Sequence, residues 1–340
     1  MKKILVTGGT GYIGSHTVVA LQQSGYEVLI VDNLSNSEET VVERIAQITG
    51  IKPAFTHLDL CDLPGLMKFF SENPRIEGVI HFAACKAVGE STEFPLKYYH
   101  NNLLGLINLL EAMQKHGCHK LVFSSSCTVY GQPDELPVSE NAPLKKAFSP
   151  YGNTKKICED IINDHSATSD LKAISLRYFN PIGAHPSALI GELPRGIPNN
   201  LVPYLTQTAI GKRVTLLVYG NDYNTPDGTG IRDYIHVVDL GEAHVTAIQR
   251  LEKEIATEKA EVFNLGTGTG YSVLEIIKTF EKVNGVKVNY TITDRRPGDI
   301  EKVWANPEKA NIILEWKARL DLVDMLRTAW AWEKKLSDVS

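Results

Sequence analysis

The sequence has no apolar segment of the roughly 20 residues that a membrane-spanning helix requires. The first apolar run, Ile4–Val6, already gives way to Thr7 and two glycines, which is too short even for the core of a signal peptide. The chain also lacks a Lys/Arg cluster that would follow a nucleic-acid backbone, an internal repeat and any low-complexity tract. These absences argue against a membrane protein, a nucleic-acid-binding protein and a repeat protein.

Cysteine is scarce, and its arrangement excludes two further classes. The five cysteines are odd in number and none has C-x-x-C spacing. A disulfide framework uses an even number of cysteines, and zinc sites use closely spaced pairs. Because free thiols persist in reducing compartments, the sequence predicts a cytoplasmic protein without a metal site.

The length and charge of the chain fit an ordinary globular protein. It has 340 residues, of which 43% are hydrophobic and 22% are charged. This length favours two domains, or one domain with a large appendage. The formal net charge of -5 is small, and a nucleotide ligand would need only one or two local arginines.

Short apolar runs alternate with amphipathic stretches in the first half, which is typical of parallel strands joined by crossover helices. We expect strands at Lys3–Val6, Glu27–Val31, Pro53–Thr56, Gly78–Phe82, Lys120–Ser124 and Lys172–Tyr178. The pattern predicts an α/β protein with a Rossmann-type, doubly wound parallel sheet.

A change of composition marks the expected domain boundary. The segment Asn180–Pro203 is rich in Pro, Gly and Asn and has no periodic pattern, as in a binding loop between domains. We therefore expect a first domain over residues 1–179 and a smaller C-terminal α/β domain over residues 180–340. The stretch of about 236–265 is expected to fold back onto the first domain, because a strand followed by glycines suits another sheet edge.

Three helices have clear sequence signals. In Pro95–His116 an apolar stripe is formed by Leu103, Leu106, Ile107, Leu110 and Met113. A second helix begins at Ser149-Pro150, a hydroxyl N-cap followed by proline at the first helical position, so Tyr151 lies at its start. A third begins with the capping box Ser272-Val-Leu-Glu275.

The segment Gly8–Gly14, with the sequence GGTGYIG, follows an expected strand and opens an expected helix. In this context glycines allow close approach of the backbone to a pyrophosphate, and the helix N-terminus binds the anion. We expect dinucleotide contacts from Gly8, Gly11, Tyr12, Ile13 and Gly14. Asp32, at the end of the second strand, would accept hydrogen bonds from the adenosine ribose and repel a 2′-phosphate, so NAD is favoured over NADP. Asp59 is a weaker candidate for an adenine contact.

Tyr151 and Lys155 are four residues apart on an expected helix and therefore share one face. A nearby positive charge lowers the pKa of a phenol, typically by about 1 to 3 units from its usual value near 10, so a tyrosine can act as a base. Ser126, after the fifth strand, could hydrogen-bond the reacting hydroxyl. These residues fall at the carboxyl ends of strands, where ligands bind to such sheets.

Together, Gly8–Gly14, Asp32, Ser126, Tyr151 and Lys155 resemble the extended short-chain dehydrogenase/reductase family. Within that family, segments over nearly the whole chain resemble the nucleotide-sugar 4-epimerases: 81–90, 177–186, 196–203, 228–237 and 295–299. The resemblance implies reversible inversion at C4 of UDP-galactose and UDP-glucose. Tyr151 would take the 4-hydroxyl proton while C4 gives a hydride to NAD, and after the 4-keto sugar turns over, the hydride would return to its other face.

The resemblance also implies the ligand contacts. Besides Tyr151 and Lys155, the cofactor would be contacted by Asn33, Asn36, Leu60, Phe82, Ala83, Ala84, Lys86, Asn101, Ser124, Tyr178 and Phe179. The UDP-hexose would be held by Lys86, Ser126, Tyr151, Asn180, Asn200, Leu201, Tyr219, Arg232, Arg296, Asp299 and Val303. The two arginines can give paired donors to a diphosphate, and Asp299 suits ribose hydroxyls. Structural ion pairs are the alternative for these arginines.

Several alternatives stay open. Related dehydratases carry an acidic pair beside the catalytic serine or threonine, whereas Cys127–Val129 stands here, so dehydration is disfavoured. Another NAD-dependent nucleotide-sugar epimerase or dehydratase, or a catalytically silent NAD-binding regulator, would keep the same fingerprint. Val303 stands where some bacterial epimerases have a bulky tyrosine, so we hypothesise that UDP-GlcNAc and UDP-GalNAc are also accepted, local packing being the alternative. Relatives commonly pair through helices like 95–116 and 150–165, which implies a homodimer.

Overall fold

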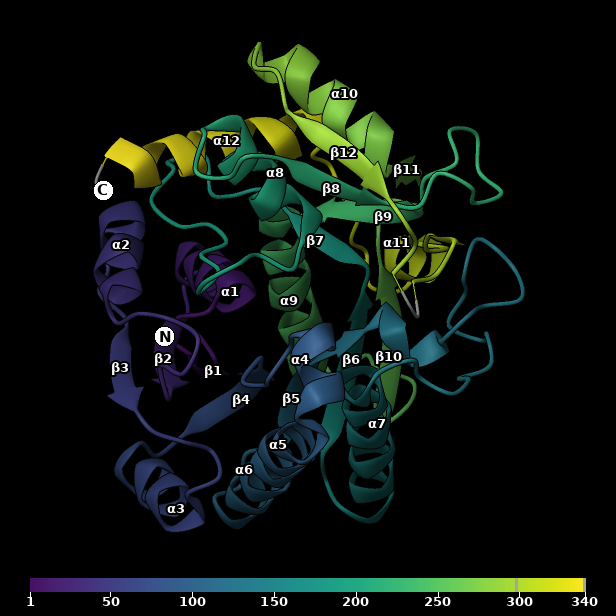
Figure 1. Cartoon of the computed structure of the whole chain (residues 1–340). Helices are drawn as coiled ribbons and strands as arrows, with labels where there is room; N and C mark the ends of the chain where they lie inside the picture. Colours follow the sequence, from purple (N-terminus) through teal and green to yellow (C-terminus); the bar gives the residue numbers. More distant parts are fainter. Residues whose placement is uncertain (297–298, 339–340) are drawn as a thin grey trace.

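The computed structural model describes residues 1–296 and 299–338. Its centre is a sheet of seven parallel strands in the order β10-β6-β5-β4-β1-β2-β3 (Figure 1). The strands are β1 (Lys3–Thr7), β2 (Glu27–Asp32), β3 (Ala54–His57), β4 (Ile76–His81), β5 (Lys120–Ser126), β6 (Lys172–Tyr178) and β10 (Ala260–Leu265). The order reverses beside β1, which is the doubly wound topology that the alternating pattern predicted. The expected α/β fold class is confirmed.

Helices cover both faces of the sheet because alternate residues of each strand point to opposite sides. Ile4 and Val6 pack towards α1 (Tyr12–Gln23) and α9 (Val237–Glu252), with α2 (Thr40–Thr49) beside α1. Leu5 points the other way, towards α3 (Leu63–Glu72), α6 (Gly105–Lys115) and α7 (Pro150–Thr168). The inner strands are therefore buried on both faces, which explains their nearly continuous apolar runs, whereas the edge strand β3 is partly exposed.

The helix expected at 95–116 is interrupted. It consists of α5 (Pro95–Tyr99), a π-helical turn (His100–Leu104) and α6, and α4 (Val88–Glu93) precedes it. Ile107 was placed on the buried stripe, but it is 38% exposed, whereas Leu109 is fully buried. The π turn adds a residue to the helical register, so a stripe drawn through it at constant spacing misplaces Ile107.

The other two helix starts are confirmed. Ser149 caps α7 by accepting a hydrogen bond from the backbone N–H of Gly152 at 3.1 Å. Ser272 and Glu275 form the expected capping box at the start of α10 (Val273–Asn284). At both positions the capping side chains alone were sufficient to predict where the helix begins.

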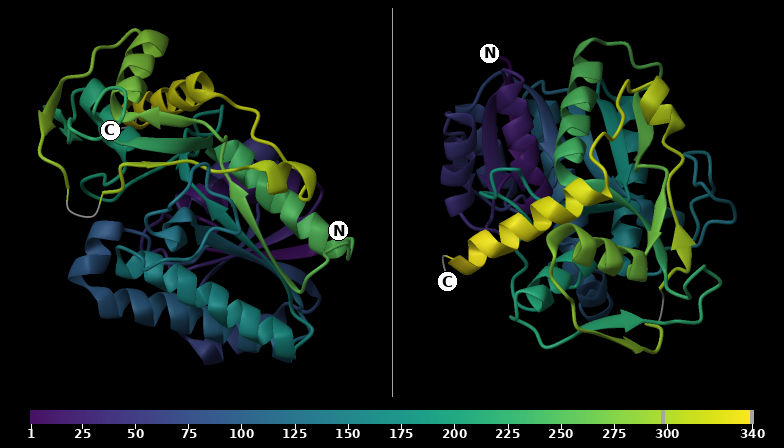
Figure 2. Two further views of the ribbon diagram at one scale, coloured as in Figure 1. Left: turned by 90° about the vertical axis from the view of Figure 1, so that its right-hand side faces the viewer. Right: turned by 90° about the horizontal axis from the view of Figure 1, so that it is seen from above.

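A second, smaller unit lies above the carboxyl edge of the main sheet (Figures 1 and 2). Its central strand β9 (Ile231–His236) pairs with β7 (Asn180–Ile182), β11 (Gly270–Ser272) and β13 (Lys302–Val303). Two further strands, β8 (Leu216–Tyr219) and β12 (Tyr290–Thr293), form a separate parallel pair. Its helices are α8 (Leu201–Ala209), α10 and α12 (Leu322–Asp338), whereas α11 (Glu308–Ile312) packs on β10 of the main sheet.

The segment Asn180–Pro203 is more regular than a binding loop. It begins with β7 and ends inside α8, because Asn200 is the N-cap residue of that helix. The part between Ile182 and Asn200 has no helix or named strand of its own, and through Arg195 it contacts the loop after β2 of the main sheet. Proline and glycine content alone did not reveal the two short elements.

The chain crosses between the two units several times. After β9 it returns along α9, which packs on α1, and β10 then pairs with β6 in parallel. The seventh strand of the main sheet, β10, thus comes from a segment distant in sequence from the other six. The division into residues 1–179 and 180–340 stays a prediction.

Among the described residues, no helix is both long and apolar enough to span a bilayer. No group of three or more His, Cys, Asp or Glu side chains in that part of the chain could hold a metal ion. The five cysteines are all free thiols.

Candidate active site

The glycine-rich turn connects β1 to α1 through very close backbone packing. A Cβ on Gly14 would lie 2.2 Å from the carbonyl oxygen of Gly8, and one on Gly8 would lie 2.7 Å from the amide nitrogen of Ala83. Gly8 also has a φ of 72°, which favours glycine. The N-cap of α1 is Gly11, and no side chain caps the helix.

This uncapped helix start fits a dinucleotide pyrophosphate. The first N–H groups of a helix lack intrahelical partners and carry a partial positive charge, so they bind an anion well. In contrast, α3 and α7 have side-chain caps at Asp62 and Ser149. Tyr12 and Ile13 form the first turn of α1, and the Tyr12 hydroxyl donates to the carbonyl oxygen of Gly183 at 2.6 Å.

Asp32 lies at the carboxyl end of β2, as expected, and is 8% exposed. Its carboxylate accepts hydrogen bonds from the backbone N–H groups of Thr10 (3.2 Å) and Leu34 (2.9 Å) and from the Ser37 hydroxyl (3.2 Å). The glycine-rich turn and the loop after β2 are therefore joined by one carboxylate. This places an acceptor where an adenosine ribose would lie beside the helix start.

Several of the expected cofactor contacts, including the adenine candidate Asp59, lie on the loops after β2 and β3. Asn33 donates to the carboxylate of Asp59 at 2.9 Å, and Asn36 is exposed. Hydrogen bonds from the Cys61 backbone and from Asn33 keep the pKa of Asp59 low, although burial acts in the opposite direction. Leu60 is buried, and its carbonyl oxygen accepts from Asn108 at 2.8 Å.

The loop after β4 carries Phe82 to Lys86. Phe82 packs against the His244 ring with the centroids 4.6 Å apart, and Ala83 and Ala84 are partly buried where the backbone meets the glycine-rich turn. Lys86 is half exposed and lies over the Tyr12 ring. Asn101 lies in the π turn and donates to Asn102 at 3.0 Å.

Asn102 was not singled out in the sequence, although it ties three parts of the site together. Its amide oxygen accepts from the Cys85 backbone at 2.8 Å, and its amide nitrogen donates to the Cys85 carbonyl (3.1 Å) and the Thr154 hydroxyl (3.0 Å). Thr154 in turn donates to the carbonyl oxygen of Tyr151 at 2.7 Å. Asn102 thereby fixes the loop that carries Lys86 against the start of α7.

The end of β5 supplies Ser124 and Ser126. Ser124 and Tyr178, from neighbouring strands, are hydrogen-bonded through their hydroxyl groups. Ser126 accepts from the backbone N–H of Thr128 at 3.2 Å and from its hydroxyl at 3.0 Å. Phe179, directly after β6, is buried.

Lys155 does not reach the Tyr151 oxygen directly. Its ammonium donates to the carbonyl oxygen of Ser124 at 2.6 Å and lies 6.0 Å from the centre of the Tyr151 ring. Burial lowers the pKa of Lys155 to about 8, against the opposing influence of Cys158 and Glu159. At neutral pH the side chain is therefore mostly protonated.

Tyr151 differs from the expectation of a lowered pKa. Burial raises the pKa of its phenol to about 12, and the contact with Ser126 lowers it only in part. Desolvation of a phenolate in a buried site outweighs a positive charge at this distance. The chain's own groups thus keep Tyr151 protonated, and the expected lowering is wrong for the protein by itself.

The expected diphosphate residues form a cluster beside β9 and β12. Asp299 lies 3.1 Å from the Nε of Arg296 and 3.9 Å from Arg232. The Arg296 guanidinium lies 4.6 Å from the centre of the Tyr219 ring, at the end of β8. The two arginines are brought together as expected, with a carboxylate between them. Of the segment 295–299, residues 297 and 298 lie outside the described part of the chain.

Asn180, Asn200 and Leu201 line the path between the two units. Asn180 begins β7 opposite Tyr234, whereas Asn200 and Leu201 form the start of α8. Val303 pairs with Arg232 in register and is buried in a cluster with Val129 and Phe179. Val303 is thus packed in this cluster, and its expected contact with the sugar stays a prediction.

Sequence reasoning also missed two side chains of the segment between β7 and α8. Arg195 donates to the carbonyl oxygens of Ser35 (2.9 Å) and Ser37. Glu192 accepts from Asn200 at 2.7 Å and pairs with Lys86. Neither has a sequence signal, because each acts through partners that only the fold brings near.

The sequence and the fold match known proteins over nearly their whole length. A family model described as GDP-mannose 4,6 dehydratase matches residues 5–329. The UDP-glucose 4-epimerase of Bacillus subtilis (strain 168) is 56% identical over 331 residues, which cover 97% of this chain and 96% of the relative.

Two solved structures show the same fold. One is the UDP-glucose 4-epimerase of Stenotrophomonas maltophila with bound NAD and formylated UDP-arabinopyranose. It is 50% identical to this chain, and the two superpose with a TM-score of 0.96 over 100% of each chain. The enzyme of Bifidobacterium longum in complex with NAD+ and UDP is 47% identical, with a TM-score of 0.93 over 99% of both chains. The chain therefore belongs to the family of UDP-glucose 4-epimerases, which are NAD-dependent isomerases.

Proposed function

We propose that this chain interconverts UDP-galactose and UDP-glucose at C4, with Tyr151, Lys155 and Ser126 as the catalytic residues. The observation that supports it most is the meeting of these three side chains near the carboxyl end of β5, where Lys155 donates to Ser124 and Ser126 contacts Tyr151. When bound, NAD would supply the hydride acceptor and donor for C4, and its oxidised nicotinamide ring would carry a positive charge.

The protein's own residues handle the proton. Tyr151 would remove the 4-hydroxyl proton as C4 is oxidised and would give it back when the 4-keto sugar is reduced on its opposite face. The mostly protonated Lys155 favours the phenolate, as does the charge of the oxidised cofactor. Ser126, beside Tyr151, would hydrogen-bond the reacting oxygen.

The ligand-binding roles are proposals of the same kind. Gly8, Gly11, Tyr12, Ile13, Gly14 and Asp32 would hold NAD, with Asn33, Asn36, Asp59, Leu60, Phe82, Ala83, Ala84, Lys86, Asn101, Ser124, Tyr178 and Phe179. The UDP-hexose would bind Lys86, Asn180, Asn200, Leu201, Tyr219, Arg232, Arg296, Asp299 and Val303. On binding, a diphosphate would draw Arg232 and Arg296 from Asp299, which frees that carboxylate for ribose hydroxyls.

Dehydration receives no support from the residues beside Ser126. Cys127–Tyr130 form a 3-10 turn in which Thr128 bonds to Ser126, and that turn contains no carboxylate. Dehydration needs an acid to expel water from the sugar. The mass of the product distinguishes epimerisation from dehydration, since a dehydratase would release a product lighter by one water.

The decisive experiment is turnover of UDP-galactose to UDP-glucose by the purified protein without added NAD, because a recycled cofactor stays bound. Tyr151→Phe should lower kcat at least about 100-fold and keep the bound NAD, since only the base is removed. Tyr290→Phe, at an exposed tyrosine of β12, is the matched control and should leave kcat unchanged. Full activity in Tyr151→Phe would refute the assigned role.

We also propose that the sugar site accepts UDP-GlcNAc and UDP-GalNAc. Val303 is small and lies beside Phe179 near the end of β6, so a bulkier side chain there would intrude on the sugar. Turnover of UDP-GlcNAc by the wild type, and its loss in Val303→Tyr with UDP-galactose still converted, would support this specificity. No turnover at high enzyme concentration would refute it.

A cytoplasmic homodimer completes the proposal. Five free thiols fit a reducing compartment. Phe94 and Leu96, which are 56% and 80% exposed, lie next to the expected pairing helices and offer apolar surface for a second copy.

A further inference from the structure

One acidic side chain joins the two parts of the site that would hold the UDP-sugar. Glu192 lies on the segment between β7 and α8, and its side chain is only 11% exposed. Its Oε1 accepts from the Asn200 amide at 2.7 Å and lies 3.6 Å from the Lys86 ammonium. Lys86 follows β4 of the main sheet, whereas Asn200 caps α8 of the smaller unit.

We propose that Glu192 is a positioning residue that sets Asn200 and Lys86 for binding of the UDP-sugar. The inference rests on the function proposed above. A carboxylate only accepts hydrogen bonds, so the Asn200 amide must turn its NH2 group towards Glu192 and its oxygen away from it. At 3.6 Å the pairing with Lys86 is ionic, and the ammonium keeps donors for an anionic ligand.

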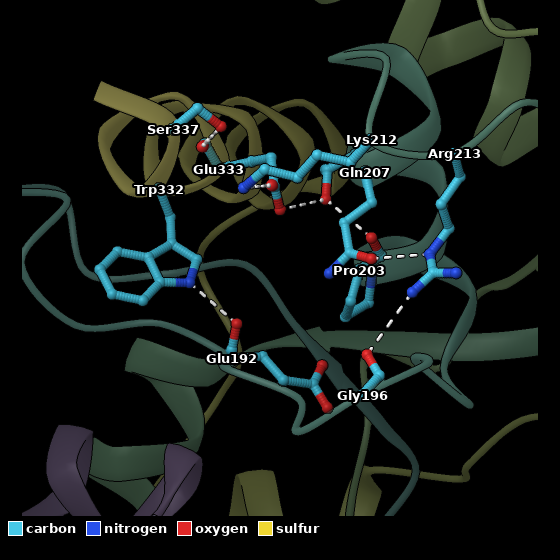
Figure 3. A network of polar contacts seen from close by, with 10 residues as sticks. Glu192, Gly196, Pro203, Gln207, Lys212, Arg213, Trp332, Glu333 and Ser337 are labelled. Atoms are coloured by element: carbon cyan, nitrogen blue, oxygen red, sulfur yellow. Dashed lines mark hydrogen bonds and ion pairs between the residues drawn. The ribbon is translucent and has the colours of Figure 1, made fainter. Parts of the chain in front are cut away.

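Glu192 is itself held by the C-terminal helix. The Trp332 indole on α12 donates to the backbone oxygen of Glu192 at 2.8 Å, and Figure 3 shows the ring directed at that oxygen. A Cβ on Gly191 would lie 2.5 Å from the Trp332 ring, so the backbone approaches the indole as closely as glycine allows. The carboxylate is thus presented from a fixed backbone position.

The helix that presents Trp332 is fixed in turn. The neighbouring Glu333 is buried and accepts from Lys212 at 2.9 Å (Figure 3). It also accepts from Thr206 on α8 at 3.2 Å. On the other side, the Arg44 guanidinium of α2 lies 5.6 Å from the centre of the Trp332 ring. The packing of α12 against α2 and α8 therefore fixes the position of Glu192, and Glu192 in turn fixes Asn200 and Lys86.

The test is a separation of KM from kcat for UDP-galactose. Glu192→Ala should raise KM on the order of tenfold, because about one hydrogen bond to a charged group is lost. Its kcat should stay within about twofold of the wild-type value. Glu192→Gln should restore most of the KM, because its amide oxygen still accepts from Asn200. Trp332→Phe keeps a ring and removes the donor, so it should raise KM several-fold. Glu43→Ala, at an exposed carboxylate of α2 paired with Lys52, is the matched control.

Two results would overturn the proposal: an unchanged KM in Glu192→Ala, or a KM in Glu192→Gln as high as in Glu192→Ala. In an Asn200→Ala background, Glu192→Ala should raise KM much less, since its main partner is gone, and a full further increase would contradict the coupling. If the wild type does not convert UDP-galactose, the proposed function fails. Calorimetric binding of UDP-glucose to the same variants then still decides the role of Glu192.

Discussion

At the scale of single residues, position was more predictable than protonation. The sequence placed Tyr151, Lys155 and Ser126 at one sheet edge, because helix spacing and strand ends follow from local pattern. The pKa of Tyr151 was not predictable, since its rise to about 12 comes mainly from burial by segments distant in sequence. Lys155 responds to the same burial with a pKa of about 8.

Lys155 should lower the stability of the fold that contains it. A protonated amine with a folded-state pKa of about 8 and an unfolded value near 10.5 binds fewer protons in the folded state, so stability rises with pH between these values. Lys155→Met should therefore be more stable at pH 7, by about 1–3 kcal/mol, and nearly inactive. Urea unfolding at pH 7 measures this.

The advantage of Lys155→Met should shrink as the pH rises from 8 towards 10, because the wild-type amine then loses its charge. Lys156→Met, at the neighbouring position, serves as the control for removal of a lysine from the same helix. A variant less stable than the wild type at pH 7 would show that the bond from Lys155 to Ser124 outweighs burial of the charge.

At the scale of elements, α7 shows what capping signals reveal and what they omit. Its start was predictable from Ser149 and Pro150, but its orientation is set by a buried ion pair. Glu159 accepts from the Nε of Arg177 on β6 at 2.9 Å and from the Ser125 hydroxyl of β5. Arg177 also donates to the Tyr130 hydroxyl at 2.9 Å. No spacing rule joins these residues, since they meet only across the folded sheet.

Breaking this pair on one side should be costly. Glu159→Leu leaves the Arg177 charge buried without its partner, so the free energy of unfolding should fall by about 3–5 kcal/mol. The double variant Glu159→Leu, Arg177→Met removes both charges and should recover much of that loss. Denaturant unfolding of the three proteins measures the difference. A double variant as unstable as the single one would show that the remaining Ser125 and Tyr130 partners, not the charge, dominate.

The π turn at His100–Leu104 was not predictable from the sequence pattern. Periodicity predicted one helix over 95–116, because an apolar stripe continues on both sides of the turn. The bulge lets Asn102 reach Cys85 and Thr154. Its functional value depends on tertiary contacts, which periodicity does not encode.

At the scale of the whole molecule, the sheet topology was predictable and the pH response was not. Four histidines, His16, His81, His236 and His244, are buried, and burial lowers their pKa values to about 3, 3, 4 and 4. The unfolded chain would protonate them near pH 6.5. Below that pH the unfolded state binds more protons than the folded state, so stability falls as the pH falls.

Each fully titrating histidine should lower the unfolding free energy by about 1.4 kcal/mol per pH unit. Between pH 6.5 and 4.5 we therefore expect a steep loss of stability, with an uptake of roughly two to four protons on unfolding near pH 5. Urea unfolding at several pH values gives this number directly. A flat profile over that range would contradict the neutral, buried state of these side chains.

The return of the chain to the main sheet has a consequence for dividing the protein. A fragment ending at residue 179 would leave β6 as an apolar edge strand with one side unpaired, because its neighbour β10 on that side comes from residues 260–265. It would also uncover the side of α1 that α9 protects. Recombination with a relative at that single site would exchange part of the main sheet together with the smaller unit, so at least three junctions are needed to exchange the smaller unit alone.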